Sequence, residues 1–174
     1  MLKPLSRSDA ASRTYTVQQV ATAAGVSRHQ IEIWITRGHI RPEHKPAPPA
    51  PRSYNLRDVL DIAVFAELSR LGIPGARCEG KVTYARGFNP NGVLVVWQGP
   101  MQLIGATDRT TGKPVVGKPT SSYDPANPPF HSEVFSIEDI PALVADPDKR
   151  ALAMVNLAHV EARVLHKLAS LDPA

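Results

Sequence analysis

The first third of the chain carries apolar positions at helical spacing, in two short runs. Residues 17–24 place Val and Ala three and four positions apart, which predicts a short helix with one buried face. Thr16 precedes this run and can cap its first turn, and Gly25 follows where a helix can end in a left-handed conformation. The pattern therefore predicts a helix that stops at a tight turn.

The second run begins directly after this turn. Ser27 can cap a helix, Gln30 lies three positions on as in a capping box, and Gly38 ends the helix. Its expected buried face consists of Ile31, Trp34 and Ile35. Two short helices that cross at a tight turn form a helix-turn-helix, which places its second helix in the DNA major groove. An ordinary helical hairpin with a glycine turn is the alternative that this segment alone leaves open.

Further motifs follow the second helix in a characteristic order. They are a Gly-x-apolar-x-Pro exit, an Arg-x-Tyr pair after a Pro-rich stretch, and a capped helix with an acidic residue in its first turn, at Gly38, Ile40, Pro42, Arg52, Tyr54, Asn55 and Asp58. Over about residues 14–76 the chain resembles the MerR family of winged helix-turn-helix regulators. This resemblance implies a DNA-binding domain with a wing, and dimerisation through a long helix.

Two features depart from the family's pattern. Trp34 stands in the recognition helix where the family usually has Tyr. The expected wing holds Lys-Pro-Ala-Pro-Pro-Ala-Pro at residues 45–51 in place of a polar, glycine-containing turn. Because successive prolines cannot donate to a β-ladder, these residues predict a stiff polyproline arm and not a hairpin.

Charge is divided unequally along the chain. Residues 1–60 hold nine Lys or Arg and four Asp or Glu (9 − 4 = +5), whereas residues 61–174 hold eleven and twelve (11 − 12 = −1). Cations that neutralise phosphates release counterions, so this asymmetry favours DNA as a partner. A solvated basic surface is the alternative for any single residue.

The DNA-binding site is expected around the second helix and the segment after it. Arg28 and His29 occupy the first turn, the part of a recognition helix that reaches bases, and Glu32 can accept from cytosine or orient an arginine. Cations and a tyrosine nearby are expected to hold the DNA backbone. The complete set is Ser27, Arg28, His29, Glu32, Arg37, Arg41, Lys45, Arg52 and Tyr54.

The rest of the chain predicts a small sheet and C-terminal helices. Short apolar runs separated by turn signals predict an antiparallel β-meander, with strands at residues 81–88, 93–97, 101–107, 115–116 and 134–135. Ser136 can open a capping box, and a long amphipathic helix is expected from Asp146 to about Leu171. Its apolar stripe can either pair with a second copy or cover the sheet, and both alternatives stay open.

The sequence thus predicts an α+β fold, with an N-terminal winged helix-turn-helix, a small antiparallel β-meander and a C-terminal amphipathic helix. The expected parts are a flexible tail (1–12), the DNA-binding domain (13–78), a β-rich domain (79–135) and C-terminal helices that can dimerise (136–174).

Other chemistry has little support in the sequence. Cys78 is the single cysteine, so no internal disulfide or multi-thiolate metal site is possible within the chain. His159 and His166 stand two helical turns apart, too far for one metal without further ligands. Trp97 and nearby aromatics can line a ligand pocket, although such residues in strands usually make core contacts. We expect no metal, cofactor or catalytic activity.

The expected function is that of a cytoplasmic, homodimeric transcription regulator that binds double-stranded DNA in a sequence-specific way. No apolar run is long enough to span a bilayer, and the N-terminus lacks a signal-peptide core. An architectural, packaging or recombination factor with the same DNA module is the main alternative. A ligand-binding or enzymatic β-domain targeted by that module has less support.

Overall fold

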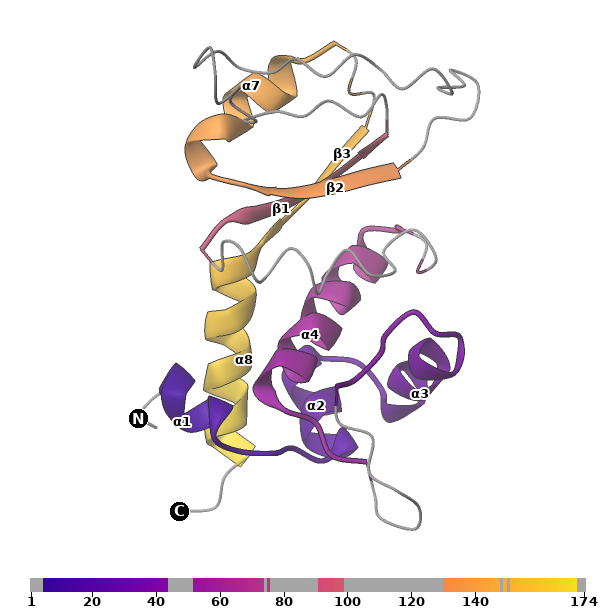
Figure 1. Cartoon of the computed structure of the whole chain (residues 1–174), viewed down its shortest axis with the longest axis vertical. Helices are drawn as coiled ribbons and strands as arrows, with labels where there is room; N and C mark the ends of the chain where they lie inside the picture. The colour runs from indigo at the N-terminus through magenta and orange to yellow at the C-terminus, as the bar shows by residue number, and fades with distance from the viewer. Residues whose placement is uncertain are drawn as a thin grey trace, which may run out of the picture.

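The computed structural model describes residues 5–43, 52–73, 75, 91–98, 130–147, 149 and 151–171. In chain order the described elements are α1 (Arg7–Ala11), α2 (Val17–Ala24), α3 (Arg28–Thr36), α4 (Leu56–Arg70), β1 (Val93–Gln98), β2 (Phe130–Phe135), the 3-10 turn η1 (Ile137–Asp139), α7 (Ile140–Ala145), β3 (Ala151–Asn156) and α8 (Leu157–Leu171). They form three tiers, with α1 to α4 and α8 below the sheet and α7 above it (Figure 1). The mixed fold, helices with a small antiparallel sheet, is as the sequence predicts.

Helices α2 and α3 have the caps that the sequence predicts. Capping boxes open both helices, at Thr16 with Gln19 and at Ser27 with Gln30. Gly25 ends α2 with φ 69°, a left-handed conformation that a side chain would strain. These caps satisfy the end groups of both helices locally, so the helix-turn-helix is encoded within its own residues.

Helix α1 lies in the segment 1–12 that was expected to be a flexible tail, and of that segment the structure describes residues 5–12. Ser6 caps this short helix through the backbone N–H of Asp9, and Ala10 is fully buried. The Tyr15 hydroxyl donates to the Ala10 carbonyl oxygen at 2.9 Å, and the burial of Tyr15 raises its pKa. This segment is therefore packed on the helical tier through contacts that its polar composition does not reveal.

The sheet has the strand order β2-β1-β3, with both neighbours antiparallel to β1. Leu94 at the centre faces Val134 on β2 and Val155 on β3. The expected meander is wrong in this respect, because the two neighbours of β1 are the distant segments 130–135 and 151–156, and the second of these was not expected to be a strand. The strands predicted at 81–88, 101–107 and 115–116 lie outside the described residues.

Strand β3 replaces the first part of the expected long helix. We expected one helix from Asp146 to Leu171, but residues 151–156 form a strand and α8 begins only at Leu157. The strand sequence Ala-Leu-Ala-Met-Val-Asn contains good helix formers, so local propensity is overridden by its pairing with β1.

The predicted capping box at Ser136 is also wrong, because the Ser136 side chain makes no capping hydrogen bond.

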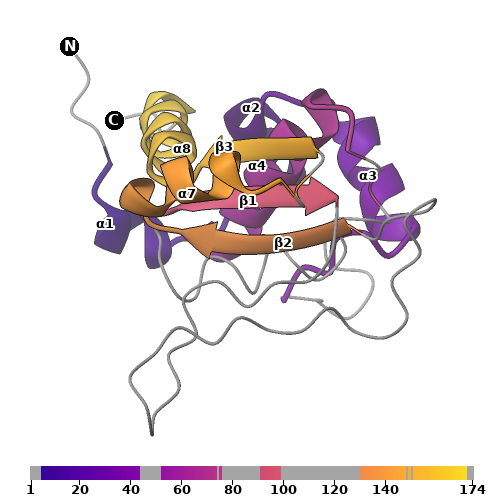
Figure 2. The same cartoon turned by 90° about the horizontal axis from the view of Figure 1, so that it is seen from above.

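The core forms one continuous body through the helical tier and one face of the sheet. It joins the helix-turn-helix to α8 and to the sheet residues Leu94, Val96 and Val155. A second cluster packs the other face of the sheet, including Trp97 and Phe135, against Leu143 of α7. Seen from above, the sheet therefore lies between α7 and the helical tier (Figure 2).

Helix α8 packs inside the chain along α2 and α4. Its apolar stripe is buried there, at Leu157, Val160, Val164 and Leu168. The stripe that could have paired with a second copy is thus covered within the chain, by α2 and α4. None of the helices in the described ranges has the length and apolarity needed to cross a membrane.

Candidate nucleic-acid interface

Helix α3, the expected recognition helix, has one face packed in the core and the opposite face exposed. Ile31 is fully buried, and Trp34 and Ile35 pack against the core as expected. On the outer face, Arg28 Nε lies 2.7 Å from Glu32 Oε1, one helical turn away. This ion pair has the geometry of one of the two roles expected for Glu32, orienting an arginine, while acceptance from cytosine stays a prediction.

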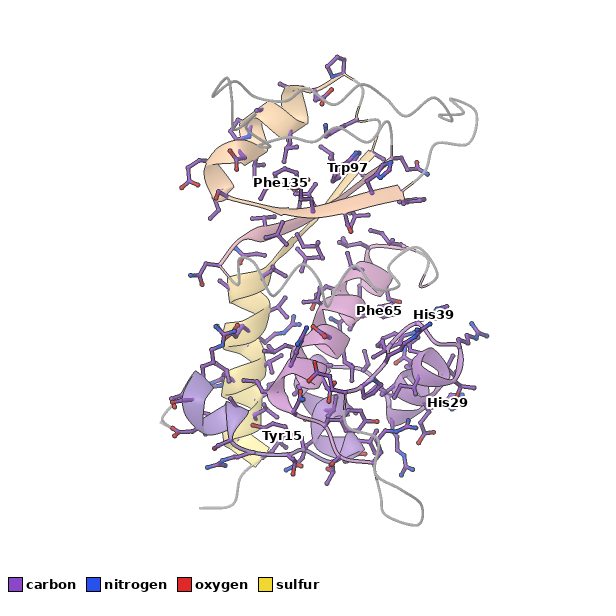
Figure 3. The ribbon with its side chains drawn as sticks, in the orientation of Figure 1. Tyr15, His29, His39, Phe65, Trp97 and Phe135 are labelled. Carbon is purple, nitrogen blue, oxygen red and sulfur yellow. The ribbon has the colours of Figure 1, made fainter. Side chains whose placement is uncertain are left out.

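The remaining predicted residues on and after α3 lie at the surface. His29, Arg37 and Arg41 are exposed, and His29 projects from α3 in Figure 3. Ser27 is exposed as well, but its hydroxyl accepts the Gln30 backbone N–H at 3.1 Å. Ser27 therefore acts as the N-cap of α3.

Two open hollows flank α3, and Arg52 lines both of them. One, of about 520 Å³, lies between the end of α3 and residues 40–42. The other, of about 380 Å³, lies between the start of α2, the Arg28–Glu32 pair and residues 52–54. Arg52 itself is exposed. Arg52 thus places a cation beside α3. A cation in this position can contact the phosphates on either side of a major groove that holds the helix.

Tyr54 has a different position from Arg52. It is only 2% exposed, and its backbone pairs with Tyr15 through N–H to carbonyl distances of 2.8 and 3.0 Å. Burial raises the pKa of the Tyr54 phenol, and a hydrogen bond with Arg52 opposes that effect in part. This burial argues against the expected phosphate contact from the Tyr54 ring, which instead supports the segment that carries Arg52.

Glu43, which precedes the Pro-rich segment, makes hydrogen bonds and an ion pair with residues that follow this segment. Its backbone N–H donates to Asp58 Oδ1 at 2.9 Å, and its carboxylate accepts from Asn55 Nδ2 at 3.1 Å. Arg57 Nη1 lies 2.8 Å from the same carboxylate. Sequence reasoning missed Glu43 because its partners are twelve or more residues away and have no characteristic spacing. Lys45 and residues 44–51 lie outside the described residues.

Asp58 is the buried centre of this arrangement, with 3% of its surface exposed. Its second oxygen accepts the Asn55 backbone N–H at 3.1 Å, which completes the capping box of α4. Burial raises the pKa of Asp58, although the hydrogen bonds from Glu43 and Asn55 oppose the shift. One carboxylate thus fixes both the start of α4 and the residue that precedes the Pro-rich segment.

Replacing Asp58 by Asn is expected to lower the free energy of unfolding by about 1–3 kcal/mol at pH 7, because one of the two backbone donors loses its acceptor. The pKa of Asp58 is higher in the folded than in the unfolded state. The stability that this difference gives to the folded state is therefore complete below the unfolded-state pKa, and it is lost as pH rises through the folded-state pKa. The advantage of wild type over Asp58→Asn should therefore narrow as pH rises through that interval.

Urea unfolding from pH 3 to pH 7 measures this difference. Asp139→Asn is the matched control, because Asp139 is exposed and makes no side-chain capping bond. An advantage of wild type that widens with pH would show that the hydrogen bonds outweigh the burial of the charge.

Aromatic packing explains why Trp34 is accommodated in α3. Its ring centroid lies 4.8 Å from that of Phe65 on α4, and the His39 ring stacks on Phe65 with its centroid at 6.2 Å. His39 and Phe65 are neighbours in Figure 3. Gly75 fits against this group so closely that an added Cβ would lie 2.9 Å from His39 Cδ2. The larger indole ring thus fixes α3 on α4 and does not face the DNA side.

The sheet tier contains a core cluster around Trp97. This residue is 2% exposed and has Phe135 and His131 as ring neighbours at 6.2 and 5.6 Å. Lys149 Nζ lies 5.5 Å from the Trp97 centroid and 2.5 Å from Asp146 Oδ2. Trp97 therefore has the core role that was the alternative to a ligand pocket.

Over the described ranges, no three His, Cys, Asp or Glu side chains are grouped so as to hold a metal ion.

Comparison with known protein families agrees with this geometry. Residues 15–81 match the model of the MerR HTH family regulatory protein. A search of curated proteins finds no match to the chain. The matched residues include α2, α3 and α4 with their three capping boxes and the exposed face of α3. Residues 15–81 are therefore similar to the helix-turn-helix DNA-binding domain of MerR-family regulators.

Proposed function

We propose that the protein is a non-enzymatic transcription regulator that reads double-stranded DNA in a sequence-specific way with α3. The observation that carries this proposal is the pair of Arg28 and Glu32, exposed in the first turns of a helix whose opposite face is anchored by Ile31. An arginine held by a carboxylate on a fixed helix loses less freedom when it meets a base edge.

The proposal assigns base reading and backbone binding to different residues. Arg28 would form a bidentate contact with guanine, the commonest specific contact in the major groove, and His29 would contact a neighbouring base. Arg52, Arg37, Arg41 and Lys45 would contact phosphates and fix the register of α3. Tyr54 and Asp58 would act indirectly, because both are buried and support the segment that carries Arg52.

We further propose that two copies bind DNA together, as the resemblance to dimeric regulators implies. The apolar stripe of α8 is already used inside the chain, so this contact would need another surface. Selection of bound duplexes from a random-sequence pool tests both points. A palindromic consensus supports a dimeric regulator, whereas salt-sensitive binding without a consensus supports the architectural alternative.

Two substitutions should separate the assigned roles. Arg28→Ala is expected to reduce discrimination between the selected site and its variants by about 1–3 kcal/mol, because one base contact is lost. Arg52→Ala should weaken binding to all sequences and reduce the slope of log K against log salt by about 0.9, the contribution of one phosphate contact. Fluorescence anisotropy at several salt concentrations measures both quantities.

Arg7→Met is a suitable control for the loss of one positive charge. Arg7 lies on α1 and pairs with Glu161 of α8 at 3.2 Å, away from α3 (Figure 1). Arg7→Met should change the affinity for DNA less than Arg28→Ala or Arg52→Ala does. Wild-type affinity in both Arg28→Ala and Arg52→Ala would refute the assignment of the interface.

A further inference from the structure

Cationic side chains from α4 and α8 converge on the turn between α2 and α3. Arg70 Nη2, at the end of α4, donates to the carbonyl oxygens of Ala24 at 3.1 Å and Gly25 at 2.7 Å. Lys167 Nζ of α8 reaches the Thr22 carbonyl at 3.4 Å. These carbonyls form the C-terminal end of α2, where the helix dipole favours positive charge.

Glu67 connects the turn to α8. Its carboxylate lies 2.6 Å from Arg70 Nη1, and the same oxygen accepts from Arg163 Nη2 on α8. The side chain of Glu67 is only 22% exposed, and that of Arg163 is 32% exposed. Both partners are therefore partly withdrawn from water, where an ion pair contributes more than on an open surface.

The ends of two cationic side chains lie close to Gly25. A Cβ added at Gly25 would lie 3.0 Å from Arg70 Nη2 and 3.6 Å from Lys167 Nζ. Both cations therefore lie directly beside the turn whose carbonyl oxygens they contact. Since α3 begins three residues later, at Arg28, the position of the turn determines where the first turn of the recognition helix starts.

Helix α8 is in turn fixed to the sheet. It follows β3 directly, and the Leu157 backbone N–H donates to the Gly92 carbonyl just before β1 at 3.2 Å. Asn156 Oδ1 accepts the His159 N–H at 3.0 Å in the first turn of α8. A displacement of β1 and β3 would therefore be carried along α8 to Arg163 and Lys167.

We propose that Arg163, Glu67 and Arg70 form a relay through which α8 holds the helix-turn-helix turn and sets the angle of α3. This inference rests on the proposed function of α3 in DNA binding. The three residues of the relay are positioning residues: they support the reading helix from behind and make no contact with DNA. The C-terminal helix, outside the matched residues 15–81, thereby becomes part of the DNA-reading machinery.

The test uses the full chain with Arg163→Met, Glu67→Gln and Arg70→Met, and a duplex recovered by selection with wild type. Each variant should bind this duplex about three- to ten-fold more weakly, within the range of coupling measured between connected sites. The slope of log K against log salt should stay at the wild-type value, because no phosphate contact is removed. The amide resonance of Gly25 should shift in all three variants. Arg7→Met, which removes a different α8 ion pair, should change neither the affinity nor this resonance.

Each result decides between the alternatives. Wild-type affinity in folded Arg163→Met and Glu67→Gln would overturn the relay, and so would a flatter salt slope in Arg70→Met, which would reveal a direct phosphate contact. If Arg70→Met does not fold, the two other variants still give the result, since Arg163→Met breaks the pair with Glu67 and Glu67→Gln removes the charge shared by both pairs. A wild-type chain that binds no duplex at any salt concentration would instead refute the proposed function.

Discussion

The substitution Val164→Asp is expected to lower the free energy of unfolding by about 4 kcal/mol or more, a large part of the stability of a small domain. Val164 is 0% exposed and lies in the middle of the α8 stripe, in the core shared with α2 and α4. An aspartate there must either bury its charge without a partner or force α8 away from the helix-turn-helix. The DNA-binding domain should therefore lose its structure although the substitution lies outside residues 15–81.

Thermal unfolding followed by circular dichroism measures this effect, and Ala162→Asp is the matched control. Ala162 lies two residues away on the exposed side of the same helix, so the same new charge should change stability by less than about 0.5 kcal/mol. If the two variants unfold at the same temperature, α8 does not contribute to the core in the way that its burial implies.

The second large effect is expected from Trp97→Ala, at about 3–5 kcal/mol, the usual result of removing a large aromatic side chain from a core. Trp97 packs with Phe135 and Leu143 in the cluster beneath α7. The opposite face of the same strand belongs to the core that continues into the helical tier. Because the two faces share one sheet, the loss should also destabilise the helix-turn-helix.

The chain has two tryptophans, so Trp34 is the only one left in this variant and its fluorescence reports on α3 directly. In Trp97→Ala, the urea midpoint reported by Trp34 fluorescence should fall below that of wild type and should coincide with the midpoint for the loss of sheet structure. Met154→Ala is the control, since Met154 is 46% exposed on β3 and its loss should have a small effect. An unchanged Trp34 midpoint in Trp97→Ala would mean that the sheet and the helical tier unfold independently.

The parts of the structure that the sequence predicted are those with local causes. Thr16 and Gln19, Ser27 and Gln30, and Asn55 and Asp58 each form a capping box within four residues, and the turn at Gly25 needs a positive φ that glycine provides. The exposed Arg28 follows from the helical period once Ile31 is assigned to the core. Short-range hydrogen bonds and periodicity therefore determine both the DNA-binding fold and its outer face.

The parts that the sequence did not predict depend on contacts between distant residues. Residues 151–156 resemble a helix by composition and become a strand only because β1 lies beside them. Nor does any local pattern link Glu43 to Asp58, or Arg163 to Glu67 across 96 positions. The direction in which the α8 stripe faces was left open for the same reason, since a stripe shows that a face is buried but not what covers it.

The packing of α8 on α2 and α4 also sets an order of events during synthesis on the ribosome. Lys167 and Thr22, which meet in the folded protein, are 145 residues apart. At ordinary elongation rates the 96 residues that follow Glu67, up to and including Arg163, take roughly 5–20 s to translate. Throughout that delay the nascent helix-turn-helix exposes the apolar surface that α8 later covers. Newly made chains should therefore be substrates for ribosome-associated chaperones until α8 has emerged from the exit tunnel.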